Sequence, residues 1–261
     1  MSGLVSRSET FFRFSAKMSD AIPAAPLEQA RERLAAAKSV AVLTGAGISA
    51  ESGIPTFRGA GGLWKNYRPE DLATPQAFAR DPRLVWEWYN WRRETIAKAA
   101  PNPAHRALVK LETTKASFNL ITQNVDGLHD LAGNARILKL HGDIWRLRCT
   151  ACGAHWPDRR VPLPKLPPHC GCGGLARPGV VWFGEPLPDG IMNEAEHAAE
   201  TADVFLVIGT SAVVYPAAGL VPHAKQNGAT VIEINLEPTP FSQMVDFSFQ
   251  QPAGELLPQL L

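Results

Sequence analysis

The segment VAVLTGAGIS, residues 40–49, joins a short apolar run to a glycine-rich turn. A continuous apolar run is typical of a strand that is buried on both faces of a parallel sheet. The glycines that follow, Gly45 and Gly47, fit a loop in which backbone N–H groups approach a dinucleotide pyrophosphate. A tight turn from strand to helix without any ligand needs the same glycines, so both interpretations stay open at this point.

The same succession of a helix-like segment and an apolar run recurs along the chain. Apolar runs at residues 118–122, 204–208 and 230–234 each follow a helix-like segment and precede polar or glycine residues. Helices that alternate with continuous apolar strands indicate a parallel sheet with helices on both faces. We therefore predict an α/β fold with a Rossmann-like parallel sheet.

Two stretches interrupt this alternation. Residues 57–100 are rich in aromatic residues and arginine, and a helical pattern around residues 84–96 marks them as a helical insertion. Residues 148–176 are dense in proline and too poor in apolar residues for a core of their own, so we expect a metal ion to stabilise them. The predicted organisation is a flexible leader at 1–26, a Rossmann-like domain at 27–56, 101–147 and 177–261, a helical insertion with a cofactor loop at 57–100, and a zinc-binding module at 148–176.

The length of the chain limits its domain organisation, and its net charge excludes some classes of binding partner. A chain of 261 residues can bury one substantial core plus a small module. The net charge is +1, so no overall field draws the protein to nucleic acid or to an anionic membrane. No apolar stretch approaches the roughly 20 residues that cross a bilayer. We expect a globular, monomeric protein that binds neither nucleic acid nor membrane.

The N-terminal segment leaves the compartment open. Arg7, Arg13 and Lys17 lie among serines and phenylalanines, with Glu9 as the one acid before Asp20, a pattern weakly similar to an organellar transit peptide. The alternative is a disordered leader, or residues upstream of a start at Met18. We predict a cytoplasmic protein, or a mitochondrial one if this leader is a transit peptide.

All four cysteines fall in one short window. A secreted disulfide framework would spread its cysteines through a smaller chain, so metal binding in a reducing compartment fits better. Two closely spaced thiolate pairs suit the closed, tetrahedral site of one structural zinc ion, which leaves no position for substrate. The second pair is more tightly spaced than usual, and His169 is an alternative ligand. The predicted zinc ligands are Cys149, Cys152, Cys170 and Cys172.

Polar residues follow the predicted strands at the edge where parallel strands open into a ligand crevice. Asn124 and Asp126 could instead form only an Asx turn and a helix cap. Several strand ends that offer such groups to one crevice predict a site of nucleotide size. Residues 53–55, Gly-Ile-Pro, end the first helix at once, and no second strand ends in an acid at the usual distance, which argues against an ordinary dehydrogenase.

Two further segments are candidates for chemistry. His141 follows the alternating run at residues 137–140, and its pKa range suits a general base near neutral pH, although a structural role is the alternative. Residues 177–185 form an extended apolar segment that suits pairing with a substrate peptide by strand addition. A plain core strand is the alternative there.

In combination, these segments resemble the sirtuin family over roughly residues 34–237. The resemblance rests on the order of its motifs: GAGIS at 45–49 with Phe57 and Arg58, QNVDGLH at 123–129, His141-Gly142, the four cysteines, VWFGE at 181–185 and GTS at 209–211.

The resemblance implies an enzyme, an NAD-dependent protein-lysine deacylase whose partners are acylated lysine side chains of proteins. In this family the acyl oxygen attacks the nicotinamide ribose, nicotinamide leaves, and the product is 2'-O-acyl-ADP-ribose. The implied catalytic residues are His141 as general base, with Asn124 and Asp126 beside it. The implied cofactor-binding residues are Gly45, Ala46, Gly47, Ser49, Phe57, Arg58, Gln123, Asn124, Asp126, Gly209, Thr210, Ser211, Asn235 and Glu237.

The helical insertion suggests the acyl group. Tyr89 and Arg92 are spaced to share one helix face, where a phenol and a guanidinium can clamp a carboxylate. This looks like the sirtuin subclass that removes succinyl and malonyl groups, and acetyl groups still fit. Ala73 matches the small residue that leaves room in that subclass, and the resemblance adds Val181, Phe183 and Gly184 as substrate-binding residues. The alternative is that Arg92 makes only a surface ion pair.

Two other functions remain possible from the sequence. ADP-ribosyl transfer to protein would begin with the same chemical step, and a non-enzymatic zinc-containing module could merely sense NAD. Whether label from NAD stays on the protein or leaves with the acyl group separates ADP-ribosyl transfer from deacylation. The presence of Asn124, Asp126 and His141 together argues against the sensing module.

Overall fold

The computed structural model describes residues 24–58, 62–63 and 68–261. Most of the predicted leader, residues 1–23, lies outside this part of the chain, and helix α1 (Ala24–Ala36) begins within the last residues assigned to that leader. The predictions about targeting, compartment and oligomeric state therefore stay predictions. Within the described residues, no helix combines the length and apolar character needed to cross a membrane.

The larger of two sheets is parallel throughout, which confirms the predicted fold class. Its strand order is β3-β2-β1-β7-β8-β9. The sequence predicted the four central strands and the run at residues 137–140 that forms β3, but it did not predict β9. The strands are β1 (Ser39–Thr44), β2 (Ser117–Thr122), β3 (Ile137–Lys139), β7 (Val204–Ile208), β8 (Thr230–Asn235) and β9 (Phe247–Gln250).

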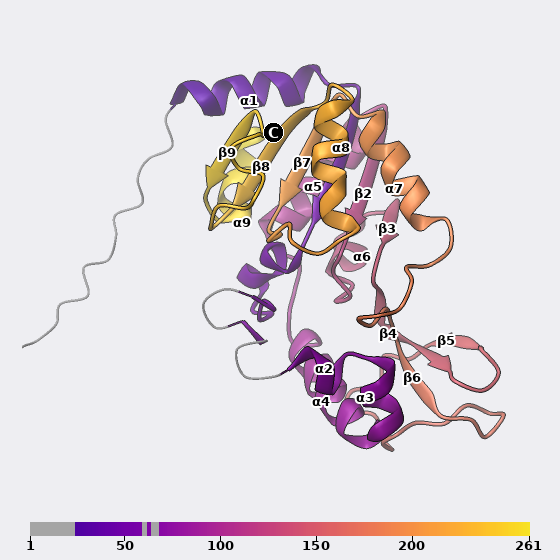
Figure 1. Cartoon of the computed structure of the whole chain (residues 1–261). Helices are drawn as coiled ribbons and strands as arrows, with labels where there is room; N and C mark the ends of the chain where they lie inside the picture. Colours follow the sequence, from indigo (N-terminus) through magenta and orange to yellow (C-terminus); the bar gives the residue numbers. More distant parts are fainter. Residues whose placement is uncertain (1–23, 59–61, 64–67) are drawn as a thin grey trace, which may run out of the picture.

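Helices cover both faces of this sheet (Figure 1). Alternate residues of each strand point to opposite faces, and both faces are apolar, so both must be buried. In β1, Val40 and Val42 pack in one apolar cluster, and Ala41 and Leu43 pack in another. The first cluster includes residues of α1, α5 (Pro103–Thr114), α9 (Ala253–Leu256) and η4 (Leu257–Leu260). The second includes residues of α7 (Ile191–Glu200), η3 (Ala217–Gly219) and α8 (Leu220–Gln226). We call this sheet with its helices the large region.

The small region comprises α2 (Pro69–Leu72), α3 (Pro75–Arg80), α4 (Pro82–Ile96) and an antiparallel sheet of order β5-β4-β6. Its strands are β4 (Gly142–Cys149), β5 (His155–Pro157) and β6 (Ala176–Val180). Side-chain oxygens of Thr74 and Asp81 accept backbone N–H groups at the starts of α3 and α4, each followed by a proline in the first turn. In Figure 1 this region lies beyond the end of the large sheet.

The small region has an apolar core that two distant parts of the sequence share. Leu163 and Ala176, from the cysteine-bearing segment, belong to one buried cluster with Trp86 of α4. The apolar residues of this segment therefore join a core that the helical insertion shares, so packing adds to any stabilisation by a metal ion. Polar contacts join the same parts: fully buried Arg93 of α4 donates to the carbonyl of Asp158 in the cysteine-bearing segment at 2.5 Å and to that of Ile144 in β4 at 3.0 Å.

Candidate active site

A cavity of about 990 Å³ opens where the large region meets the small region. One wall comes from the segments that follow β1, β2, β7 and β8, as expected for the carboxyl edge of a parallel sheet. The other wall comes from α4 and from the turn after β6. Predicted site residues on the walls are Gly45, Ala46, Gly47, Phe57, Arg58, Ala73, Tyr89, Arg92, Gln123, Asn124, His141, Val181, Phe183, Gly184, Gly209, Thr210, Ser211, Asn235 and Glu237.

Glycines let the turns after β1 and β7 touch. The N–H of Gly47 donates to the carbonyl of Gly209 at 2.7 Å, and a Cβ added to Gly47 would lie 2.7 Å from the Cα of Gly209. Gly209 has φ of +59°, and a Cβ there would lie 2.2 Å from the nitrogen of Ile48. These glycines are therefore required by the fold, and they also bring backbone to the cavity wall. The turn continues as η1 (Ala46–Ser52) and ends at Gly53, as the sequence predicted.

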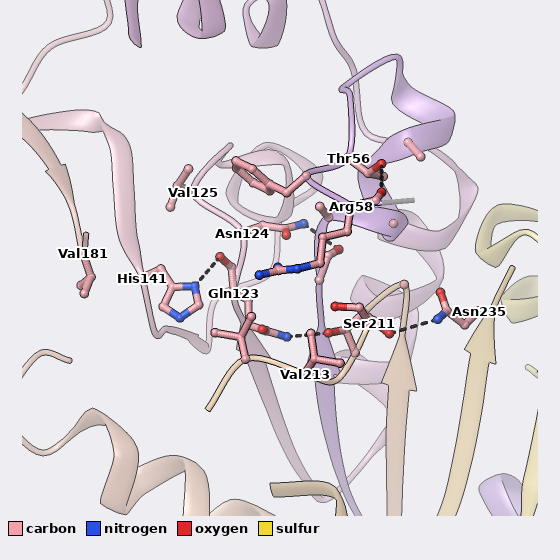
Figure 2. Close-up of a pocket in the computed structure, with 18 of the residues that line it drawn as sticks. Thr56, Arg58, Gln123, Asn124, Val125, His141, Val181, Ser211, Val213 and Asn235 are labelled. Carbon is pink, nitrogen blue, oxygen red and sulfur yellow. Dashed lines mark hydrogen bonds between the residues drawn. The ribbon is translucent and has the colours of Figure 1, made fainter. Parts of the chain in front are cut away.

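His141 is held in one orientation at the edge of the cavity. Its Nδ1 lies 3.0 Å from the carbonyl oxygen of Gln123, as Figure 2 shows. A carbonyl only accepts hydrogen bonds, so Nδ1 carries the proton and Nε2 keeps a free lone pair. Burial lowers the pKa of His141, and the hydrogen bond to Gln123 partly opposes this. The imidazole is therefore neutral at pH 7 and can act as a base through Nε2.

Side-chain amides tie the strand ends to one another. Asn124 donates through Nδ2 to the carbonyl of Gly45 at 3.1 Å. Gln123 donates through Nε2 to the Thr210 hydroxyl at 2.9 Å, and Asn235 donates to the Thr210 carbonyl at 3.0 Å. Figure 2 shows Gln123, Asn124 and Asn235 arranged around one space. These contacts fix the polar groups of β1, β2, β7 and β8 before any ligand binds.

Ser49 and Asp126 do not lie on the cavity wall, although both were predicted site residues. The Ser49 hydroxyl donates to Asp126 Oδ2 at 2.8 Å, and the N–H of Leu128 donates to Oδ1 at 2.8 Å. Both side chains are buried, and burial raises the pKa of Asp126. Ser49 also contacts Asn124 Nδ2 at 3.3 Å, so in this structure the pair supports Asn124 from behind. A direct role for either residue stays a prediction.

Tyr89 and Arg92 lie together at the end of the cavity formed by the small region. Both are buried, with 2% and 8% of their surface exposed. The Arg92 guanidinium stacks over the rings of Phe57 at 4.8 Å and Trp88 at 5.0 Å. Among the described residues no carboxylate lies within 4.0 Å of it, so the alternative of a surface ion pair is wrong. Burial lowers the pKa of Arg92, and the neighbouring Tyr89 and Asp126 partly oppose this.

Residues 177–185, the segment predicted to bind substrate, form a strand only as far as Val180 and then turn. β6 ends at Val180, and the N–H of Glu185 then donates to the carbonyl of Trp182 at 3.0 Å. The N–H of Val181 donates to the carbonyl of His141 at 2.9 Å, and that of Phe183 donates to the carbonyl of Ala73 at 3.0 Å. The turn therefore joins His141 to Ala73 along the cavity wall.

The four cysteines form a compact thiol cluster at the far end of the small region. Their sulfur atoms all lie within 4.8 Å of one another, with Cys149 and Cys172 at 3.5 Å and Cys152 and Cys170 at 3.8 Å. A tetrahedral zinc site with bonds of about 2.3 Å has sulfur–sulfur edges of about 3.8 Å, so the cluster fits one zinc ion. The backbone N–H groups of Ala151 and Cys152 each donate to the Cys149 sulfur at 3.4 Å, hydrogen bonds that stabilise a thiolate ligand. His169 is not part of this cluster.

Several cavity residues were missed by sequence reasoning. Trp88 lies one helical turn before Arg92, so helical periodicity could have found it. Trp182 lies inside a recognised motif but was given no role. Nothing in the sequence pointed to residues 213–216 or to Gln251, Pro252 and Ala253, because only the packing of the chain brings them to the wall.

The fold and the cavity together define a nucleotide-binding α/β protein that carries a metal-binding small region. The chain belongs to the Sir2 family, whose model matches residues 45–216.

Relatives and solved structures agree with this assignment. An NAD-dependent protein deacylase of Aquifex aeolicus is 56% identical over 83% of this chain and 91% of its own length. A mutant Sir2 homologue solved as an ADP ribose complex superposes with a TM-score of 0.87 at 49% identity, covering 89% of this chain and 94% of that one. A Sir2 homologue–NAD complex gives 0.84 at 50% identity, with coverage of 89% and 91%.

Proposed function

We propose that this protein is an NAD-dependent protein-lysine deacylase that removes succinyl and malonyl groups and also accepts acetyl groups. Family membership and the deacylase names of its relatives support the general activity. The NAD and ADP-ribose complexes among its structural neighbours support the co-substrate. The acyl preference rests on this chain's own Tyr89 and Arg92.

The cavity fits NAD on two observations. The glycine turns after β1 and β7 bring backbone to the wall at places where a Cβ would clash, as close approach of a pyrophosphate requires. The wall then continues past the ends of β7 and β8 to Asn235 and Glu237, where the second nucleoside would lie. When bound, NAD supplies a ribose carbon that takes up the acyl oxygen as nicotinamide leaves.

The orientation of His141 is the observation that carries the catalytic proposal. Gln123 holds the Nδ1 proton, so Nε2 can take a proton from a ribose hydroxyl. The lowered pKa keeps the ring in its basic form near neutral pH. Hydrogen bonds to Gly45 and Ser49 fix the Asn124 side chain, which would orient the nicotinamide ribose beside His141.

The acyl proposal follows from the incompletely compensated charge of Arg92, which Asp126 attracts without forming an ion pair. A buried guanidinium without a carboxylate partner is costly, and a carboxylate that enters with the substrate would remove that cost. A succinyl or malonyl group carries such a carboxylate, and an acetyl group does not. The nearby Tyr89 hydroxyl offers a second polar contact.

The test compares NAD-dependent nicotinamide release with succinyl-lysine and acetyl-lysine peptides. His141→Tyr should lower release with both peptides by about 100-fold or more. Arg92→Met should remove the preference for succinyl-lysine, whereas Arg83→Met, an exposed change on the same helix, should preserve it. If acetyl-lysine is preferred and Arg92→Met changes nothing, the acyl proposal fails and only the broader deacylase survives. Label from NAD that stays on protein would instead indicate ADP-ribosyl transfer.

A further inference from the structure

The Tyr89 hydroxyl has a hydrogen-bond partner that fixes its role. Trp182 donates through its indole Nε1–H to the Tyr89 oxygen at 2.9 Å. Both side chains are almost completely buried, with 3% and 2% of their surface exposed. The contact joins α4, which carries Tyr89, to the turn after β6, which carries Trp182.

Trp182 is itself held from three directions. The Arg177 guanidinium lies 3.4 Å from the centre of the indole ring, and the ring of Phe78 lies 5.3 Å away. Arg177 also forms a two-pronged ion pair with Glu185 at 2.6 and 2.8 Å. The same carboxylate accepts the backbone N–H of Trp182 at 2.8 Å. The indole therefore has little freedom to turn away from Tyr89.

This arrangement leaves only one use for the hydroxyl hydrogen of Tyr89. A phenol donates one hydrogen bond and accepts others, and an oxygen that already accepts from an indole cannot direct its hydrogen at that donor. The guanidinium of Arg92, the other polar neighbour, has no acceptor to offer. Among the described residues no acceptor for this hydrogen is present. The hydrogen is thus left for a ligand in the cavity, and accepting from Trp182 strengthens it as a donor.

The geometry points to Trp182 as a positioning residue that sets acyl specificity: it makes Tyr89 a donor for the acyl carboxylate. An ionised carboxylate only accepts hydrogen bonds, so it fits a donor phenol beside a guanidinium, whereas an acetyl methyl group gains nothing from either. The inference rests on the proposed function, because it concerns the same acyl site. It adds a residue that touches the tyrosine and acts through it.

The decisive variant is Trp182→Phe, which keeps an aromatic ring for Arg177 and Phe78 but removes the N–H. Its matched control is Trp86→Phe, because the indole of Trp86 is also buried, on the helix that carries Tyr89, but donates to the carbonyl of Ala176. Kinetic constants should be measured with succinyl-lysine and acetyl-lysine peptides at saturating NAD. Thermal unfolding of each variant identifies any general loss of structure.

Trp182→Phe should lower kcat/KM for succinyl-lysine relative to acetyl-lysine by about tenfold, the value of one hydrogen bond to a charged network. The change should fall mainly on KM, since the carboxylate lies away from the reacting carbonyl. Trp86→Phe should leave the ratio of the two substrates as in the parent. In a Tyr89→Phe background, Trp182→Phe should add little, because its route to the substrate is already gone.

The outcomes separate this inference from the proposed function. If the parent prefers succinyl-lysine but Trp182→Phe keeps that preference, or adds its full effect to Tyr89→Phe, Trp182 does not act through Tyr89 and only this inference falls. If the parent does not turn over succinyl-lysine at all, the acyl proposal and this inference fall together. An equal loss in Trp86→Phe would reduce the effect to general destabilisation and would also overturn it.

Discussion

The two walls of the cavity are built on different physical principles. In the large region the polar groups at the strand ends already bond to one another, and glycine turns pack without space for a Cβ. In the small region the buried Arg92 guanidinium has no carboxylate within 4.0 Å among the described residues, and the Tyr89 hydroxyl has no acceptor there. The first wall is complete before a ligand arrives, and the second is completed by one. Under the proposed function, the complete wall suits a co-substrate that never varies, and the incomplete wall selects the acyl group.

The largest expected difference between the regions comes from metal removal. Chelation should unfold the small region, because structural zinc contributes on the order of 10 kcal/mol in small metal-dependent modules. All seven tryptophans fall between residues 64 and 182, within the helical insertion or the β4-to-Trp182 segment, so their fluorescence reports on that part of the chain. We expect a red shift of this fluorescence while most far-UV circular dichroism is retained.

Zinc added back after chelation should reverse the shift, and metal analysis should show one equivalent per chain. A chain that loses its metal without any change in fluorescence would mean that the apolar core shared by α4 and Leu163 is sufficient alone.

A smaller effect should follow from Gly209→Ala in the large region. A Cβ there would lie 2.2 Å from the nitrogen of Ile48 at a φ of +59°, so the turns after β1 and β7 must separate. We expect a loss of about 3 kcal/mol in the free energy of unfolding, measured by urea denaturation. Gly228→Ala is the matched control, because its φ is +92° and nothing lies within 4 Å. That variant should lose only about 1 kcal/mol from backbone strain, and equal losses would contradict the packing argument.

The smallest expected effect is the change in the free energy of unfolding per pH unit. His105 and His129 are buried in the large region with ring centres 4.8 Å apart. Burial lowers the pKa of His105 to about 4 and that of His129 to about 3. Between pH 6.5 and these lowered pKa values, both histidines are protonated in the unfolded chain but stay neutral in the folded chain. The free energy of unfolding should therefore decrease as the pH is lowered below 6.5, by up to about 1.4 kcal/mol per pH unit for each histidine.

Urea denaturation at pH 7, 6 and 5 measures this slope. His129→Gln should make the slope shallower, whereas His197→Gln, at an exposed position, should not. A slope that His129→Gln leaves intact would assign the acid sensitivity to other groups.

The large region was predictable from sequence because its signals are local. Each central strand is a continuous apolar run, and the groups after it must meet at one edge once the sheet is parallel. The thiol cluster was predictable for the same reason, since four cysteines in one window have few other uses. His141 could be placed at a strand end, although the tautomer required the contact with Gln123.

The small region was harder because its contacts join distant segments. The core that unites Trp86 with Leu163 joins the aromatic-rich helical insertion to a segment that is too poor in apolar residues for a core of its own. The hydrogen bond between Trp182 and Tyr89 joins residues 93 positions apart, and no sequence periodicity predicts it. Asp126 was read as a wall residue from its position in a motif, but its hydrogen bonds to Ser49 and Leu128 turn it inward.

The position of β1 in the sheet also has a consequence for how the chain is made. β1 lies between β2 and β7, yet β7 begins only at Val204. While the chain is being synthesised, one edge of this apolar strand has no partner, and the turn at Gly47 lacks the Gly209 against which it packs. Such long-range parallel pairing is slow, and an open strand edge promotes aggregation. The large region therefore cannot finish folding until the last third of the chain has been synthesised. Until β7 is present, the open edge of β1 must be protected from aggregation.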